Sequence, residues 1–313
     1  MVRVAVLGAG NHSELNHGPS LRDAAARSPG EVELAAVCDL DLDRARRYAS
    51  RFGFAASYTD LREMVKREHP DAIVAVTPVA ATRSVVGELL SYRIPLMIEK
   101  PPGRTPAETR ELLDLARRNA TPHMISFNRR YLPAAIKARE WLSRRAAAEA
   151  PRLIVARMLR EHRREKDFVT GTAIHLIDAV LSFMGRPRAS VHHRWVTPLG
   201  GQSCDARIEF EGGEAAICVI APDSGLDEET YEIIGPDYSI AIDAGACRLR
   251  IHHASLLELA WSPPADSLPH VLHGCVEETD AFLRAVAGRG AYSPTLEDGL
   301  VSVETAHELD RPA

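Results

Sequence analysis

The sequence predicts an α/β protein with an N-terminal doubly wound parallel sheet and a C-terminal α/β domain whose sheet is open and largely antiparallel. Three observations support this fold class. Short apolar runs, the first at Val4–Leu7, alternate with helical patterns over roughly the first 120 residues. A glycine turn, Gly8-Ala9-Gly10, follows the first run directly. After Pro187 the runs alternate apolar and polar residues, which is typical of antiparallel strands.

Length and composition indicate a globular protein with two domains. The 313 residues are 45% hydrophobic and 26% charged, and we place the domain boundary so that the ranges are 1–122 and 123–313. The net charge of −5 indicates no general affinity for nucleic acid or membrane, and no apolar run is long enough to cross a bilayer. The chain enters a core strand at once, and its five cysteines are widely spaced, so we expect a cytoplasmic protein without a secretory leader.

The first part of the chain gives a regular order of elements. Asn11–Gly30 contains Gly18 and Pro19 and is expected to hold a loop before a delayed helix. Helical spacing and apolar runs then predict the following elements: helices over Asp41–Phe52, Asp60–Glu68, Thr82–Ser91 and Pro106–Asn119, and strands over Leu34–Cys38, Ala72–Val76 and Pro95–Ile98.

The second part begins with helical patterns and continues with strands. We expect helices over Tyr131–Ala148, Thr170–Met184, His273–Ala287 and Leu296–Leu309. Strands are expected over Leu153–Leu159, Ser190–Val196, Cys204–Glu211, Glu214–Ile220, Glu229–Ile234, Tyr238–Asp243, Arg248–His252 and Leu256–Trp261.

The glycine turn and the acid after the second apolar run suit a dinucleotide site. Gly8 allows a tight turn, and Gly10 lets the backbone approach a pyrophosphate that the next helix binds through its N–H groups. Asp39 can accept hydrogen bonds from the hydroxyls of an adenosine ribose, although it follows Gly8 by 31 residues rather than the usual ~20. The alternative is an ordinary βαβ unit in which Asp39 caps a turn.

A second candidate site follows the strand expected at Pro95–Ile98. Ligands of a doubly wound sheet lie beyond the carboxyl ends of its strands, which places Lys100, in the strand-end segment Glu99-Lys100-Pro101-Pro102, at the cofactor crevice. Pro101 fixes the direction in which the backbone leaves the sheet. A lysine amine there can hydrogen-bond a substrate oxygen and move its proton while a hydride is transferred. The alternative is a surface lysine after a strand.

The third candidate is a histidine on an apolar helix. His175 and Asp178 are three residues apart, so on a helix they share a face among apolar neighbours. The histidine can pass a proton to or from a substrate, with Asp178 either orienting it or facing groups behind it that do not touch the substrate. The alternative is a hydrogen-bonded histidine of the core.

Together these motifs resemble the Gfo/Idh/MocA oxidoreductases along nearly the whole chain. Glu99-Lys100-Pro101 is the most specific of them. The other elements of the resemblance occur in the family's order, and they are Gly8-Ala9-Gly10, Val37-Cys38-Asp39, Thr77-Pro78 and His175-x-x-Asp178.

The resemblance implies a Rossmann domain, then a domain for substrate binding and oligomerisation, in a homodimer or homotetramer. It implies NAD(P)-dependent hydride transfer between nicotinamide and a small sugar, cyclitol or related polyol. Lys100 would be catalytic and His175 its partner in proton transfer. Cofactor binding would fall to Gly8, Gly10, Asn11, His12, Asp39, Thr77, Pro78, Glu99 and Lys100, and substrate binding to Asn128, Arg130 and Asp178.

Some positions depart from the family's pattern. Gly171 stands where an acid is common, Thr82 where a histidine is common, and Ser13 where the fingerprint has its third glycine. Asp167 is close enough in sequence to replace the missing acid. These departures keep a second hypothesis open, a catalytically impaired NAD(P)-binding sensor or regulator of the same fold.

The acid after the second strand also predicts the choice of cofactor. Asp39 would repel a 2′-phosphate, which would itself need a neighbouring arginine. Leu40 comes next, and Arg44 and Arg46 lie further along the helix, so NAD is expected rather than NADP.

No metal site is expected from the sequence. His12 and His17 are five residues apart, which is not the spacing of a ligand pair on an α-helix, and no His-Glu-x-x-His pattern occurs. A basic group precedes the helix of His175 and is either a solvated edge or an anchor for an acidic or phosphorylated substrate. Its members are Arg157, Arg160, Arg163, Arg164 and Lys166.

Overall fold

A computed structural model of the chain describes residues 1–197 and 200–311 and contains two compact units. The first unit holds residues 1–126, 268–271 and 275–300, and the second holds the intervening segments and the C-terminal residues. The units therefore interleave along the chain, and the predicted domain boundary at 122/123 stays a prediction.

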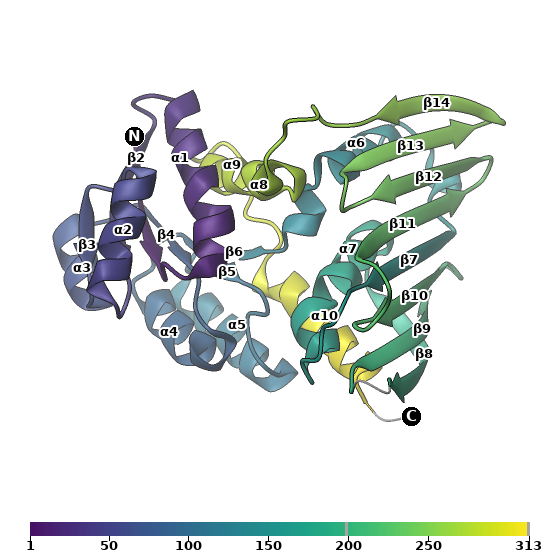
Figure 1. Cartoon of the computed structure of the whole chain (residues 1–313), viewed down its shortest axis with the longest axis horizontal. Helices are drawn as coiled ribbons and strands as arrows, with labels where there is room; N and C mark the ends of the chain where they lie inside the picture. Colours follow the sequence, from purple (N-terminus) through teal and green to yellow (C-terminus); the bar gives the residue numbers. More distant parts are fainter. Residues whose placement is uncertain (198–199, 312–313) are drawn as a thin grey trace. The chain divides into compact units, whose positions relative to one another are not determined.

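The first unit is built on a parallel sheet of six strands in the order β3-β2-β1-β4-β5-β6 (Figure 1). Its central strand β1 is covered on both faces, and Val4, Ala5 and Val6 are fully buried, which explains the uninterrupted apolar run. Two short strands, β3 and β6, were not predicted. The six strands are β1 (Val2–Leu7), β2 (Val32–Cys38), β3 (Ala56–Tyr58), β4 (Ala72–Ala75), β5 (Leu96–Glu99) and β6 (His123–Ser126).

The helices between these strands begin at side chains that cap them. Asp41, Asp60 and Thr105 each accept a hydrogen bond from the backbone N–H three residues later, at the first turns of α2, α3 and α5. Later in the chain, α9 packs against α1, and Asp280 pairs with Arg27 at 2.6 Å. The helices are α1 (Gly18–Arg27), α2 (Leu42–Phe52), α3 (Leu61–Glu68), α4 (Val79–Ser91), α5 (Pro106–Asn119), α8 (Pro269–Leu272) and α9 (Cys275–Val286).

The segment after the glycine turn is helical from its first residues, so the predicted loop within Asn11–Gly30 is wrong. A π-helical turn, η1 (Ser13–His17), leads directly into α1. Gly18 and Pro19 fall at this junction. A Cβ at Gly18 would lie 2.5 Å from the ring of Phe52, so this glycine lets α1 approach α2 closely.

The second unit is built on an eight-stranded sheet in the order β14-β13-β12-β11-β7-β10-β9-β8 (Figure 1). Neighbouring strands are antiparallel except β7 and β10, so the predicted open, largely antiparallel sheet is confirmed. The strands are β7 (Leu153–Leu159), β8 (Pro187–Val196), β9 (Gln202–Phe210), β10 (Ala215–Ala221), β11 (Glu228–Gly235), β12 (Tyr238–Asp243), β13 (Arg248–His253) and β14 (Leu256–Trp261).

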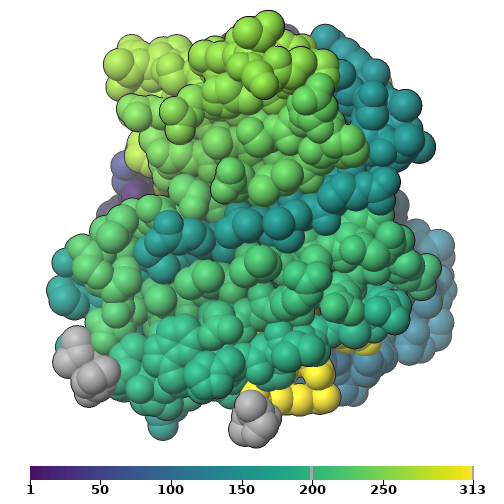
Figure 2. Space-filling view, turned by 90° about the vertical axis from the view of Figure 1, so that its right-hand side faces the viewer, coloured from purple at the N-terminus to yellow at the C-terminus, as the bar shows by residue number. Residues whose placement is uncertain are grey.

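Helices cover one face of this sheet. Alternate residues of β7, Ile154, Ala156 and Met158, are fully buried, and α7 packs on that strand while α6 packs on β12 and β13. The strands fill the opposite face in Figure 2. The helical segments are η2 (Asn128–Tyr131), α6 (Pro133–Leu142), η3 (Ala147–Glu149), η4 (Phe168–Thr172) and α7 (Ile174–Met184), and α10 (Leu296–Leu309) closes the chain.

Two further expectations concern the whole chain. Among the described residues, no helix is long and apolar enough to cross a membrane. All five cysteines are buried. The cytoplasmic location stays a prediction.

Candidate functional site

The glycine turn follows β1 in the chain. It lies at the boundary between the neighbouring strands β1 and β4, where the strand order of the first sheet reverses. Gly8 has φ +95°, and a Cβ there would lie 1.9 Å from the carbonyl oxygen of Val76, so no other residue fits. A Cβ at Gly10 would meet nothing within 4 Å, so there is space beside the backbone at this point. This combination suits a pyrophosphate approaching the turn, because such ligands bind at the switch point beyond the strand ends.

The acid after β2 is tied to the glycine turn. One oxygen of Asp39 accepts a hydrogen bond from the N–H of Ala9 at 2.8 Å, and the other accepts from Asp41 N–H and from the guanidinium of Arg44 at 2.7 Å. Burial alone would raise the pKa of Asp39, but Arg44 and the two N–H groups hold that pKa below its usual value. The carboxylate is thus ionised and fixed beside the turn. Sequence reasoning had placed Arg44 away from it.

Other predicted cofactor residues surround the same strand ends. Asn11 and His12 are exposed in the first helical turn after Gly10. Thr77 follows β4, and its hydroxyl lies 3.0 Å from the hydroxyl of Thr82, which is buried. Pro78 precedes the first residue of α4. Thr82, where the family often has a histidine, therefore acts as a hydrogen-bond partner for Thr77.

Glu99 ends β5 and is the centre of a polar cluster. One carboxylate oxygen lies 3.0 Å from His12 Nε2 and 2.9 Å from His17 Nε2, and the other accepts the backbone N–H of Lys100 at 2.9 Å. Burial alone would raise the pKa of Glu99, but the charges and hydrogen bonds of the two histidines hold it well below its usual value. Lys100 itself is half-buried.

The two histidines share one helix face, contrary to the expectation from their spacing. In a π-helix the hydrogen bonds join residues i and i+5, so side chains five apart come together. His12 directly precedes η1 and His17 ends it. Sequence reasoning used the α-helical period and therefore missed the pair.

In the second unit, the predicted substrate residues form a buried ion pair. Arg130 donates to both oxygens of Asp178 at 2.8 and 2.7 Å, and Ser302 donates to Asp178 at 2.8 Å. Asp178 is fully buried and Asn128 nearly so. Asp178 thus holds the guanidinium of Arg130 in place. His175, half-buried on α7, packs edge-on against the ring of Phe127 with 6.4 Å between ring centroids.

The glycine that replaces the common acid lies beside another carboxylate. A Cβ at Gly171 would be 3.5 Å from Oδ2 of Asp167. The helical turn η4 that joins these residues brings them together, because the N–H of Gly171 donates to the carbonyl of Asp167. Asp167 therefore occupies space next to the side-chain position of residue 171.

A third buried cluster was missed by sequence reasoning. Glu229 on β11 accepts hydrogen bonds from Arg129 at 2.7 and 2.9 Å, from Arg160 at 2.5 Å and from Tyr231 at 2.7 Å. Burial alone would raise the pKa of Glu229, but the two arginines and the tyrosine lower it to about 2. The sequence did offer a signal. Glu229, Tyr231 and Ile233 are alternate residues of one strand, so the glutamate lies on the same buried face as its two apolar neighbours.

This cluster also bears on the basic group that precedes α7. Arg160 is held by Glu229, Arg157 lies 3.2 Å from Glu228, and Arg163 pairs with Glu165. Three of its five members are thus neutralised by nearby carboxylates, and Arg160 is not part of a solvated edge.

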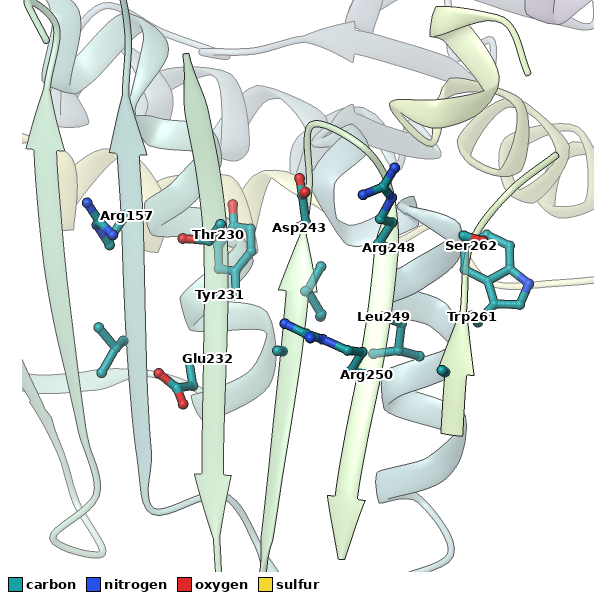
Figure 3. A pocket seen from close by; sticks show the side chains of 14 residues that line it. Arg157, Thr230, Tyr231, Glu232, Asp243, Arg248, Leu249, Arg250, Trp261 and Ser262 are labelled. Atoms are coloured by element: carbon teal, nitrogen blue, oxygen red, sulfur yellow. The ribbon is translucent and has the colours of Figure 1, made fainter. Parts of the chain in front are cut away.

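A groove of about 870 Å³ lies on the open face of the second sheet. Figure 3 shows its side chains on neighbouring strands, among them Arg157, Thr230, Glu232, Arg250 and Trp261. Of the residues that the sequence analysis singled out, Arg157 of the basic group lines it, whereas the proposed catalytic residues, the proposed cofactor residues, Asn128, Arg130 and Asp178 do not. It is a feature of the sheet surface rather than of the candidate site.

The sheet order and the anchored glycine turn define a nucleotide-binding α/β protein of the Rossmann class. Residues 2–127 match the model of the Gfo/Idh/MocA family, described as an oxidoreductase family with an NAD-binding Rossmann fold. The N-terminal part of the chain therefore matches the family that its motifs resemble, and the predicted resemblance is confirmed over these residues.

The curated relatives share less than 30% sequence identity with this chain. D-glucoside 3-dehydrogenase of Escherichia coli K12 is 27% identical over 224 residues, which cover 67% of this chain and 62% of that protein. The matches span less than two thirds of the curated relatives' own length.

Solved structures agree with the fold over the whole chain. A dehydrogenase from Chromobacterium violaceum has a TM-score of 0.87 at 19% identity, covering 99% of this chain and 94% of that one. Levoglucosan dehydrogenase in complex with NADH has a TM-score of 0.84 at 19% identity, covering 98% and 95%. These likenesses establish the two-part α/β fold.

Proposed function

We propose that this protein is an NAD-dependent dehydrogenase or reductase that transfers a hydride between nicotinamide and a sugar, cyclitol or related polyol. The observation that carries the proposal is the glycine turn. There is space beside the backbone at Gly10, and the N–H of Ala9 is hydrogen-bonded to Asp39. Glu99 and Lys100 lie at the end of β5, another strand of the same sheet. The names of D-glucoside 3-dehydrogenase and levoglucosan dehydrogenase favour a carbohydrate substrate.

The residues of the turn fit a dinucleotide. The backbone at Gly8 and Gly10 and the first helical turn at Asn11 and His12 would hold the pyrophosphate, while Asp39 would accept hydrogen bonds from the adenosine ribose. Thr77, Pro78 and Glu99 would complete the site at the neighbouring strand ends. When bound, NAD supplies the carbon that accepts or gives the hydride.

Lys100 is the proposed catalytic residue. Its amine would hydrogen-bond the reacting oxygen of the substrate and take its proton during oxidation, and return it during reduction. We propose that His175 takes part in the same proton transfer. Asp167 would supply the carboxylate that Gly171 lacks, which its position beside residue 171 supports. Asn128 and Arg130 would bind substrate hydroxyls, with Asp178 holding the Arg130 guanidinium in place.

NAD is the proposed cofactor rather than NADP. The Asp39 carboxylate faces the turn as an anion, and a 2′-phosphate would be repelled by it. Arg44 lies at 2.7 Å and is neutralised by the same carboxylate. Discrimination between the cofactors thus depends on the Asp39–Arg44 pair.

We propose a homodimer or homotetramer assembled through the open face of the second sheet. This face carries exposed apolar side chains, Val191, Trp195 and Ile217, beside charges of both signs such as Arg207 and Glu232. A second copy presents the same mixture and can pair acids with bases. Light scattering on the eluting peak of a size-exclusion column measures the mass directly.

The test of the function is turnover by a lysine variant. Lys100→Ala should lower the kcat for the best substrate of a panel of polyols, glycosides and sugar acids by about 10²–10⁴-fold, while NAD binding measured by calorimetry is retained. Lys66→Ala, which removes an exposed lysine of α3 in the same unit, is the matched control and should keep full activity.

The same assay separates the enzyme from the sensor hypothesis. If the parent chain binds NAD but no compound of the panel reduces the bound NAD, the hypothesis of an NAD-binding sensor or regulator replaces the proposed enzyme. If Lys100→Ala turns over as fast as the parent, the lysine does not carry the chemistry. His175→Ala and the double variant then show whether the two residues act as a unit, since the losses of coupled groups do not add.

A further inference from the structure

The cluster around Glu99 brings three side chains of metal-binding type to one point. The Nε2 atoms of His12 and His17 and a carboxylate oxygen of Glu99 all lie within 4.8 Å of one another. Both imidazoles point at the same oxygen, at 3.0 and 2.9 Å. This convergence is a property of the fold, because the two histidines meet only through the π-helical turn η1.

We propose that His12, His17 and Glu99 bind a divalent transition-metal ion, with Zn²⁺ as the expected occupant. The ligand set consists of two imidazole nitrogens and one carboxylate oxygen, which suits zinc and its neighbours, whereas Mg²⁺ and Ca²⁺ prefer oxygen ligands alone. Bonds of about 2.0–2.2 Å in a tetrahedral arrangement separate ligand atoms by roughly 3.3–3.5 Å. The two His–Glu distances of 3.0 and 2.9 Å need to open by only a few tenths of an ångström to reach this separation, and the two imidazole nitrogens lie within 4.8 Å of each other.

The surroundings of the three ligands support an ion site with one open side. The side chains of His17 and Glu99 are 3% and 10% exposed, whereas that of His12 is 49% exposed. An ion can therefore enter past His12, and solvent can supply the remaining coordination position. Two buried ligands and one half-exposed ligand at the surface give a site that is preformed and still accessible.

A neighbouring amide can orient the exposed ligand. The side-chain nitrogen of Asn16 lies 3.3 Å from His12 Nδ1 and 3.1 Å from the His12 carbonyl oxygen. Metal-bound histidines usually donate their other ring N–H to an oxygen nearby. Here the Asn16 amide nitrogen donates to the His12 carbonyl while Asn16 Oδ1 accepts from Cys275 Sγ at 3.6 Å, so Asn16 positions His12 through its backbone.

The competing interpretation is that the cluster only fastens the first helix to β5. In that case the three side chains stabilise the first unit by hydrogen bonds and bind no ion. The two interpretations differ in metal stoichiometry, which is measured without NAD. The proposed function gives His12 and Glu99 to the cofactor, so ion binding is tested on the chain without NAD, and an inactive chain that binds one ion would still support the metal site.

The test measures ion binding by the full chain after treatment with a chelator and dialysis. The stripped protein is titrated with Co²⁺, whose visible absorption reports coordination by nitrogen and oxygen, and then with Zn²⁺, which should displace it. Metal content is counted by elemental mass spectrometry. We expect one equivalent per chain. His12→Gln, His17→Gln and Glu99→Gln should each weaken binding at least about tenfold.

Two choices of variant make the result decisive. His12→Gln removes the half-exposed ligand, so its far-ultraviolet circular dichroism should match that of the parent even if the buried variants fold poorly. His69→Asn removes an exposed histidine of the same unit at a position with φ +46°, which asparagine accepts, and should leave binding unchanged. Failure of the parent to bind Co²⁺, or equal binding by His12→Gln and the parent, would overturn the proposal.

Discussion

Glu99 in the first unit and Glu229 in the second are both buried carboxylates on strands, yet their partners differ in kind. Glu229 is held by the guanidiniums of Arg129 and Arg160 and by a tyrosine hydroxyl. Glu99 is held by two imidazoles and a backbone N–H. Both acids have a lowered pKa, so that property alone does not distinguish them.

The difference lies in what each partner can do. A guanidinium is always charged and offers a fixed planar fork of donors, so Glu229 and its arginines form a permanent cross-link between β11, η2 and the residue that follows β7. An imidazole can be neutral and can give up its hydrogen bond to a ligand or an ion. Glu229 therefore belongs to the structure of the second unit, whereas the imidazole partners of Glu99 can release it to a ligand or an ion.

The sharpest way to test this comparison is to neutralise each acid. Glu229→Gln leaves two buried guanidiniums without a counter-charge and should lower the free energy of unfolding by about 3–5 kcal/mol. Glu99→Gln leaves imidazoles that can become neutral, and should cost about 1–2 kcal/mol. All three tryptophans, Trp141, Trp195 and Trp261, are in the second unit, so their fluorescence in urea reports its unfolding.

Each variant has an internal control. Glu232→Gln changes an exposed glutamate on the same strand as Glu229 and should leave the urea midpoint unchanged. The unfolding of the first unit in the Glu99 variant is followed by circular dichroism. If Glu229→Gln and Glu99→Gln cost the same, the distinction between guanidinium and imidazole partners is wrong.

The second prediction concerns acid. The pKa of Glu229 is about 2 in the folded chain and near 4.5 in the unfolded one, so its contribution to stability is complete above about pH 4.5. As pH falls from 4.5 towards 2, about 3 kcal/mol of stability should be lost, at about 1.4 kcal/mol per pKa unit. The tryptophan-monitored midpoint, measured between pH 2 and 6, should fall less steeply in Glu229→Gln. Parallel curves for the two proteins would contradict the assignment.

These two sites also show how much of the structure can be predicted from the sequence. Periodicity predicted the fold because buried strands and helix faces are local patterns. The range Pro106–Asn119 was predicted as observed, and so were Leu153–Leu159 and Leu256–Trp261. The helix expected at Tyr131–Ala148 ends at Leu142, because the following alanines and arginines have helical propensity but little apolar surface to bury.

Partners are harder to predict than elements. The positions of Lys100 and Asp39 directly after strands could be predicted, because the end of an apolar run is visible in the sequence. Arg129 and Glu229 are a hundred residues apart, and nothing local joins them. His12 and His17 are close in sequence, but their meeting depends on a π-helical turn whose period no hydrophobic pattern reports.

A third carboxylate, Asp39, stands between the two cases and gives the smallest expected effect. It is bound by a guanidinium, as Glu229 is, but Arg44 is 46% exposed and the carboxylate also accepts two backbone N–H groups. Replacing this acid should therefore perturb stability little and ligand choice more. Asp39→Ser removes the repulsion of a 2′-phosphate and releases Arg44 to bind it.

The expected result is a shift of about tenfold in the ratio of kcat/KM for NADP to that for NAD, which is about 1.4 kcal/mol. Asp43→Ser, which alters an exposed acid on α2 that lies 3.6 Å from Arg46, is the matched control and should leave the ratio unchanged. Adding Arg44→Ala to Asp39→Ser should cancel the gain with NADP, because the arginine supplies it. An unchanged ratio in Asp39→Ser would mean that the carboxylate serves the glycine turn through Ala9 N–H and does not face the ribose.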